Sequence, residues 1–326
     1  MDGIYDSQGG IRSNFHIILF SSNSPANLCR VTEFFQQIIN GLSLGAIYAL
    51  IALGYTMVYG VLRFINFAHS DIFMVGAFSG YFFSRFFPSE SIFGGISVVF
   101  LSMLVCAFLG MLIERVAYRP LRGSSKLNVL ITAIGVSMFL EYSFQVKLTK
   151  PLSFPVLFPT MSFTLPGGII LSSTQVLVFV MTLLLLIALQ YIVLYTKMGT
   201  AMRAVSFNPM AASLVGINND AVISFTFGLG SALAAAGGIL YSLNYPSIEP
   251  LMGVLPGLKA FVAAVLGGIG NIPGAALGGL LLGVIETFVN GSRYSTYTDA
   301  IAFTLLIIIL IFRPSGLLGK VTVEKV

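Results

Sequence analysis

The chain has 326 residues, of which 56% are apolar and only 9% are charged, and its mean hydropathy is +0.94. Soluble domains carry about 25% charged residues, so this sequence cannot cover an ordinary water-facing surface and is predicted to be an integral membrane protein. The net charge of +5 does not indicate nucleic-acid binding, because positive loops of membrane proteins set their orientation in the bilayer. The two cysteines, Cys29 and Cys106, exclude a thiolate metal cluster.

The first segment, residues 1–31, differs from the rest of the chain. Its apolar run, residues 15–20, is too short to span a bilayer and is short even for the core of a signal peptide. We expect either an N-terminal extension without a defined structure or a mis-assigned start, with the true start at Val31.

The membrane spans are predicted from the stretches between charges, because a spanning helix needs about 20 mostly apolar residues. These stretches are residues 34–62, 91–113, 151–196, 221–248, 260–285 and 300–312, together with 127–146, which Glu141 interrupts, and 64–87, which His69, Asp71 and Arg85 interrupt. A glycine-rich break at residues 267–274 makes the stretch of residues 260–285 one long helix or two short ones. The sequence therefore predicts an all-α bundle of eight or nine spans over residues 32–317, followed by a short cytoplasmic tail, residues 318–326.

Basic residues in the loops predict the orientation of the bundle. Residues 114–126 carry four basic residues against one acid, and residues 196–220 carry Lys197 and Arg203. Since lysine and arginine accumulate in cytoplasmic loops, both loops are expected in the cytoplasm. The proline-rich residues 150–172 then lie outside, as an extended connection.

Small residues recur at four-residue spacing in three of the predicted spans. Such stripes let helix backbones approach closely in a membrane, so we interpret them as packing faces. The stripes are Gly41, Gly45 and Ala49; Gly228, Ala232 and Ala236; and Ala275, Gly279 and Gly283.

Polar residues inside the predicted spans are candidates for a translocation pathway, because such residues usually face a cavity or a partner. Asn66 and His69 lie three residues apart, which predicts one helix face, and Glu286 interrupts another apolar run. The alternative is that His69 is neutral and hydrogen-bonded to a neighbouring helix, with Asp71 and Glu141 near the interface.

The sequence offers no candidate for catalysis. With only His16 and His69, neither a histidine metal site nor a histidine-dependent triad can be assembled, and no phosphate-binding P-loop occurs. We therefore expect no catalytic residue, no metal and no cofactor. If solute moves against a gradient, the nucleotide is hydrolysed on another chain.

The loop of residues 196–220 is predicted to hold a short helix over residues 209–215. Asn208 followed by Pro209 is a helix-start signal, and Gly216 is a stop signal. A short helix held between two spans suits docking to a partner. An amphipathic helix lying on the membrane would carry more lysine and arginine than this stretch does.

Several sequence blocks resemble the permease subunits of branched-chain amino-acid ABC importers, the LivH type. The blocks are residues 40–60 (Asn-Gly-Leu-Ser-Leu-Gly-Ala-Ile-Tyr at their start), 65–69 (Ile-Asn-Phe-Ala-His), 113–122 (Ile-Glu-Arg-Val-Ala-Tyr-Arg-Pro-Leu-Arg), 203–218 (Arg-Ala-x-x-x-Asn-x-x-Ala-Ala-x-x-x-Gly-Ile-Asn), 259–274 and 324–326. The resemblance covers nearly everything after Val31. It departs at Ser70 and Asp71, where the family commonly has Gly-Glu, so no role is carried over to position 70.

The resemblance implies a type II ABC importer fold in a bacterial inner membrane. It implies pairing with a LivM-like second permease subunit, two ATPase subunits below, an extracytoplasmic solute-binding protein that delivers an amino acid, and contact with membrane lipid. It also implies a coupling motif that fits a cleft of an ATPase subunit. The matching residues are Arg203, Ala204, Asn208, Ala211, Ala212 and Gly216.

Two other functions are considered. Within the family, urea or short amides are the alternative substrates to branched-chain or other neutral amino acids. A stand-alone channel or secondary transporter would also have broken helices and intramembrane polar groups. That class predicts an inverted repeat, which we do not find in the sequence, and leaves the helix of residues 209–215 without a partner.

Overall fold

The computed structural model describes residues 25–319 except residues 65, 166 and 167. For residues 25–30 it describes the backbone only. Most of the expected N-terminal extension, and residues 320–326 of the expected tail, lie outside the described residues. Residues 25–31 form the start of the first helix, which continues without interruption into the bundle.

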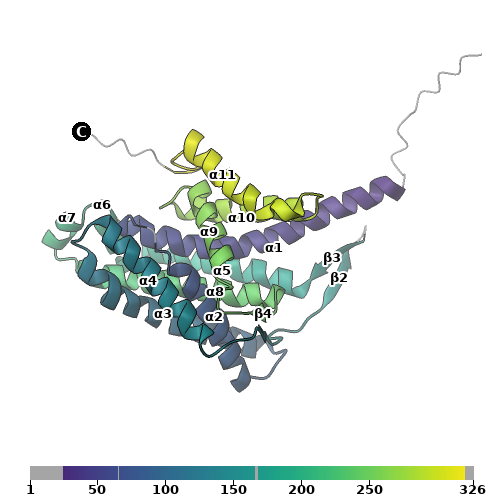
Figure 1. The fold of residues 1–326 in the computed structure, drawn as a ribbon, viewed down its shortest axis with the longest axis horizontal. Coiled ribbons are helices and arrows are strands. Elements are labelled where there is room, and N and C mark those ends of the chain that lie inside the picture. Colours follow the sequence, from purple (N-terminus) through teal and green to yellow (C-terminus); the bar gives the residue numbers. More distant parts are fainter. Residues whose placement is uncertain (1–24, 65, 166–167, 320–326) are drawn as a thin grey trace, which may run out of the picture.

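The described chain is almost entirely helical, with two small pairs of strands (Figure 1). The long helices are α1 (Pro25–Leu62), α3 (Ile92–Ile113), α4 (Lys126–Gln145), α5 (Ser173–Tyr195), α8 (Asn219–Asn244), α10 (Ile272–Asn290) and α11 (Thr298–Phe312). The shorter helices are α2 (His69–Phe83), α6 (Lys197–Phe207), α7 (Pro209–Leu214) and α9 (Val254–Gly267). The strands are β1 (Leu152–Ser153), β2 (Ser162–Leu165), β3 (Ile169–Ser172) and β4 (Ser247–Ile248).

Seven helical segments in the described part of the chain are long and apolar enough to cross a membrane. They contain α1, α3, α4, α5, α8, α10 and α11, and α2 and α9 are shorter helices of 15 and 14 residues within the same bundle. An α-helix rises 1.5 Å per residue, so α2 and α9 reach only part of the way across the roughly 30 Å hydrocarbon layer. The expectation of a polytopic helical membrane protein is confirmed.

The glycine-rich break separates α9 from α10, so two short helices are present rather than one long one. Gly268 has φ +107°, a conformation that glycine adopts without strain, and Asn271 caps the N-terminus of α10. The amides of Leu317 and Leu318 donate to the carbonyls of Leu266 and Gly267, at 2.8 and 3.0 Å. The segment after α11 thereby satisfies carbonyls that the break leaves free.

The predicted glycine stripes pack α1 against α10. A Cβ atom added at Gly41 or Gly45 would lie 2.7 Å from the backbone of α10, at the Cα atoms of Val284 and Leu280. A Cβ atom on Gly283 would meet the backbone of Gly45 in return. The two backbones are therefore in direct contact, and the interpretation of these stripes as packing faces is confirmed.

The two ends of the bundle differ in structure. One end, here called the hairpin end, holds the antiparallel pairs β1–β4 and β2–β3, and the side-chain amide of Gln36 on α1 binds both the amide and the carbonyl of Ile170 on β3. The opposite end, here called the coupling end, holds α6 and α7 (left in Figure 1).

Basic residues are more numerous at the coupling end. Those at the coupling end are Arg63, Arg115, Arg119, Arg122, Lys126, Lys197, Arg203 and Arg313, and those at the hairpin end are Arg85, Lys147, Lys150 and Arg293. The positive-inside rule predicts from these residues that the coupling end is the cytoplasmic one, and the orientation stays a prediction.

Candidate functional site

The expected docking loop is built from two helices rather than one. The predicted short helix is present as α7, with Asn208 as its N-cap accepting from the amide of Ala211 at 3.1 Å and Pro209 in its first turn. The sequence analysis did not predict α6, although Thr196 accepts from the amide of Gly199 at 3.1 Å as its N-cap. A threonine three residues before a glycine is a weak start signal, which is why α6 was missed.

Gly216 ends α7 in a Schellman motif. The amide of Ile217 donates to the carbonyl of Ala212 at 3.0 Å, and Gly216 has φ +86°. A Cβ atom on Gly216 would meet nothing within 4 Å, so the backbone conformation, rather than space, requires glycine here.

Arg203 holds the corner between α5 and α6. Its guanidinium donates to the carbonyl of Val193 and, at 3.3 Å, to the carbonyl of Leu194. These are among the last carbonyls of α5, where a positive charge is favourable because of the helix dipole. Arg203 therefore stabilises the base of the loop.

Four large apolar side chains are exposed on α6 and α7. We call them the α6–α7 patch: Phe207, Met210, Leu214 and Val215, whose exposed fractions are 89%, 76%, 82% and 77%. Grouped apolar exposure outside a membrane span marks an interaction surface. Among the residues that match the coupling motif, Ala212 is 3% exposed and so does not itself lie on this patch.

The candidate pathway residues have partners inside this subunit. His69 is buried, with its Nε2 3.2 Å from the carbonyl oxygen of Ile51 on α1 and its ring against Tyr55. Asn66 is buried too and accepts from the hydroxyl of Tyr118 at 2.6 Å. The prediction of one helix face was wrong, because α2 begins at His69 and Asn66 precedes it. The geometry of His69 fits the alternative of a neutral histidine bonded to a neighbouring helix.

Glu286 belongs to a charged group that the sequence did not predict. Lys259 on α9 lies 2.6 Å from Glu286 on α10 and 2.7 Å from Asp299 on α11. Lys259 and Glu286 are buried, and the side chain of Asp299 is half-exposed. No fixed spacing relates three residues on three helices, so only the fold brings them together.

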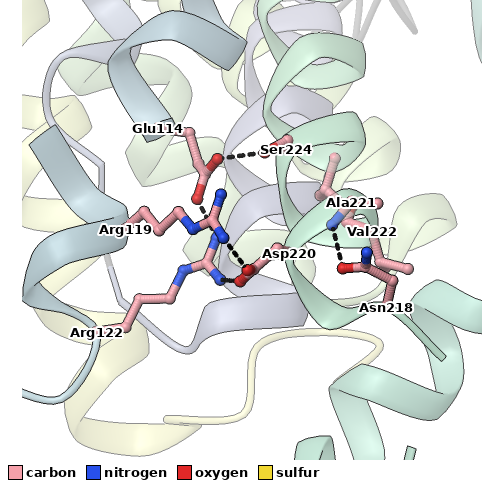
Figure 2. Close-up of polar contacts among 9 residues, drawn as sticks. Glu114, Arg119, Arg122, Asn218, Asp220, Ala221, Val222 and Ser224 are labelled. Atoms are coloured by element: carbon pink, nitrogen blue, oxygen red, sulfur yellow. Dashed lines mark hydrogen bonds and ion pairs between the residues drawn. The ribbon is translucent and has the colours of Figure 1, made fainter. Parts of the chain in front are cut away.

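An ion-pair cluster lies at the coupling end, between the start of α8 and the segment after α3 (Figure 2). Asp220 on α8 pairs with Arg119 and Arg122, and Arg122 also pairs with Glu114. Ser224, one turn along α8, donates to the other oxygen of Glu114. Glu114 is fully buried and begins a π-helical turn, Glu114–Tyr118. These arginines were predicted to set the orientation and belong to one of the family blocks, but their pairing was not predicted from the sequence.

The apolar helices, the break between α9 and α10 and the capped helix pair with an exposed apolar patch are together typical of the membrane subunit of a transporter. Residues 37–310 match the family described as the branched-chain amino acid transport system, permease component. This chain belongs to that family of permeases. Membership confirms the resemblance described above and the expectation that the chain is a transport subunit and not an enzyme.

Curated relatives match over nearly their whole length. The high-affinity branched-chain amino acid transport system permease protein BraD of Pseudomonas aeruginosa is 42% identical over 305 residues, covering 91% of this chain and 99% of the relative. The high-affinity branched-chain amino acid transport system permease protein LivH of Escherichia coli is 41% identical over 301 residues, and LivH of Salmonella typhimurium is 40% identical over 305 residues. Each match covers 90% of this chain and 98% of the relative. No solved structure matches the chain.

Proposed function

We propose that this chain is one permease subunit of an ABC importer that moves branched-chain or other neutral amino acids across a bacterial inner membrane. The family and the names of the relatives support the substrate class. The chain has no P-loop, so the energy comes from separate subunits that hydrolyse ATP. The remaining parts are a LivM-like second permease, two ATPase subunits and an extracytoplasmic binding protein.

The observation that carries this proposal is the α6–α7 patch. Its four apolar side chains project from a helix pair that is capped at Asn208, closed at Gly216 and held to α5 by Arg203. A pre-organised apolar surface loses little conformational entropy when it binds. We infer that an ATPase subunit covers the patch and that Ala204 and Ala211 give it room to approach.

For the translocation pathway, we propose one of the three predicted residues as the main candidate. Asn66 keeps one buried amide nitrogen, Nδ2, without a hydrogen-bond partner among the described residues. A buried group of this kind is costly unless something binds it, so Asn66 is the first candidate to contact a polar solute. His69 and Glu286 remain candidates, and their partners favour roles in holding α2 and α10 in place.

Docking is tested by placing a charge on the patch. We expect Leu214→Asp to remove the ATPase subunits from the purified complex, because a buried interface tolerates an unpaired carboxylate poorly. The matched control is Val146→Asp at the hairpin end, a side chain of similar exposure at 81%. Retention of the ATPase subunits by Leu214→Asp would contradict docking at this patch.

The substrate is tested in vesicles that contain the assembled importer and its binding protein. We expect ATP-dependent uptake of leucine, isoleucine or valine, and none of urea or acetamide. Uptake of urea or acetamide without uptake of the amino acids would replace the proposed substrate with the alternative one.

A further inference from the structure

The ion-pair cluster lies where the docking loop enters the bundle. Only residues 215–218 separate α7 from α8. The side chain of Asn219, the first residue of α8, donates to the carbonyl of Pro209, the first residue of α7, at 2.8 Å. With a short link and a hydrogen bond between the helix starts, α7 cannot be displaced without moving the first turn of α8.

The cluster ties that same turn of α8 to the end of α3. Asp220 lies in the first turn of α8 and pairs with two arginines from the segment after α3, and Glu114 at the end of α3 accepts from Ser224 of α8. The four charged groups are two acids and two bases, so the cluster is neutral. Bulges of the π type, such as the turn Glu114–Tyr118, occur frequently at functional sites.

Above the cluster, α3 and α8 are in close contact. A Cβ atom on Gly110 of α3 would lie 2.7 Å from the Cβ of Ser231 and 3.0 Å from the carbonyl oxygen of Phe227, both on α8. A Cβ atom on Gly228 of α8 would lie 3.1 Å from Cγ of Met111. Helices packed this closely resist sliding past one another, so α3 and α8 move as a pair.

A cavity lies beside the loop. A cavity of about 300 Å³ lies between α6, the ends of α1 and α5, and the start of α10, and Met57, Val193 and Phe207 are among its lining residues. The hydroxyl of Ser206 donates to the carbonyl of Gly60 at 2.6 Å across this region. Unfilled space therefore lies beside α6, which touches α1 at Ser206.

We propose that Glu114, Arg119, Arg122 and Asp220 are positioning residues that transmit displacement of α7 to the α3–α8 pair. The inference rests on the proposed docking of an ATPase subunit at the α6–α7 patch. Movement of the docking helices is passed through Asp220 and the two arginines to α3. The displacement thereby reaches the end of α3 and the first turns of α8.

The outer part of the cluster contributes little to folding. The side chains of Arg119 and Asp220 are 44% and 41% exposed, and ion pairs of such exposure add little stability. Their removal is therefore expected to affect transmission and to leave the bundle intact. Glu114 is fully buried, and its substitution would disturb the fold as well.

The test uses the assembled importer in vesicles, with uptake, ATP hydrolysis, retained ATPase subunits and thermal stability all measured. We expect Asp220→Asn to lower the amount of amino acid moved per ATP by about tenfold, a typical size for coupling between sites, while the ATPase subunits stay bound. Asp220→Glu keeps the carboxylate and is expected to restore most of the ratio. Arg115→Gln is the matched control, since Arg115 is an exposed arginine of the same segment.

Other results would overturn the proposal. An unchanged ratio of uptake to ATP in Asp220→Asn would do so, as would an equal fall in Arg115→Gln. If Asp220→Asn does not assemble, Arg119→Gln replaces it, with a lowered ratio expected and an unchanged ratio contradicting the proposal. The Leu214→Asp variant tests the docking proposal separately. If the ATPase subunits remain bound to that variant, the docking proposal fails, whatever the result for Asp220→Asn.

Discussion

The interior around α10 and the coupling end are stabilised in different ways. In the interior, α10 lies in backbone contact with α1 through glycines, and Glu286 is paired with the buried Lys259. At the coupling end, α6 is held to the bundle by the hydrogen bonds of Arg203 and by the buried Met202 and Val205, and the four patch side chains are exposed. The first region cannot change shape without loss of packing, whereas the second is built to be held by a partner.

This difference separates two kinds of mutational effect. Changes in the interior should lower the free energy of unfolding and reduce the amount of folded subunit. Changes at the coupling end should lower transport while most of the folded subunit remains. The following four predictions run from the largest expected effect to the smallest.

Lys259→Met should destabilise the subunit most. It leaves the buried carboxylate of Glu286 without its cation, and breaking a buried pair by removing one partner costs about 3–5 kcal/mol. Thermal unfolding in detergent measures the change, and Lys147→Met, at an exposed lysine, is the control. Equal stability of the two variants would show that the interior does not depend on this pair.

Gly45→Ala should lower stability by about 1–3 kcal/mol, because the added methyl group forces α1 away from α10. The control is Gly135→Ala on α4, where an added Cβ meets nothing within 4 Å. That change should stabilise the helix slightly, since glycine is unfavourable inside helices. Opposite signs for the two variants are expected, and the same sign would contradict close packing as the cause.

Gly216→Ala should destabilise the end of α7 by about 1–2 kcal/mol, because residue 216 has a left-handed backbone conformation that alanine adopts poorly. Because α7 is peripheral, the loss is expected to appear as reduced uptake, with a melting temperature close to that of the unchanged protein. Gly123→Ala, where an added Cβ also has open space, should alter neither. A large fall in melting temperature would place α7 in the folded core rather than at the docking surface.

Asn208→Ala should have the smallest effect, about 1 kcal/mol for a lost N-cap. The first turn of α7 would fray and uptake would fall modestly. Asn208→Ser can still cap the amide of Ala211 and should retain uptake. If the serine and alanine variants behave alike, Asn208 acts through something other than the cap.

The sequence predicted the features that depend on local pattern. The stripe of Gly41 and Gly45, the break before Asn271 and the short helix after Asn208 each follow from spacing or from a residue with a known backbone preference. The observed structure has all three.

Features that depend on the fold could not be predicted in the same way. Glu114 and Asp220 come together only because α3 and α8 pack side by side, and Lys259 meets Asp299 across 40 positions of sequence (259 to 299). The burial of Ala212 could not be predicted for a similar reason. A small residue fits equally well on a docking face or under a helix, and only the orientation of α7 decides between the two.

Photo-crosslinking in the assembled importer tests the central claim most directly. A photoreactive residue at position 214, in place of Leu214, is predicted to crosslink to an ATPase subunit, and one in place of Val146 is predicted not to. Crosslinks from position 214 to lipid alone, or to an ATPase subunit from both positions equally, would contradict docking at the α6–α7 patch.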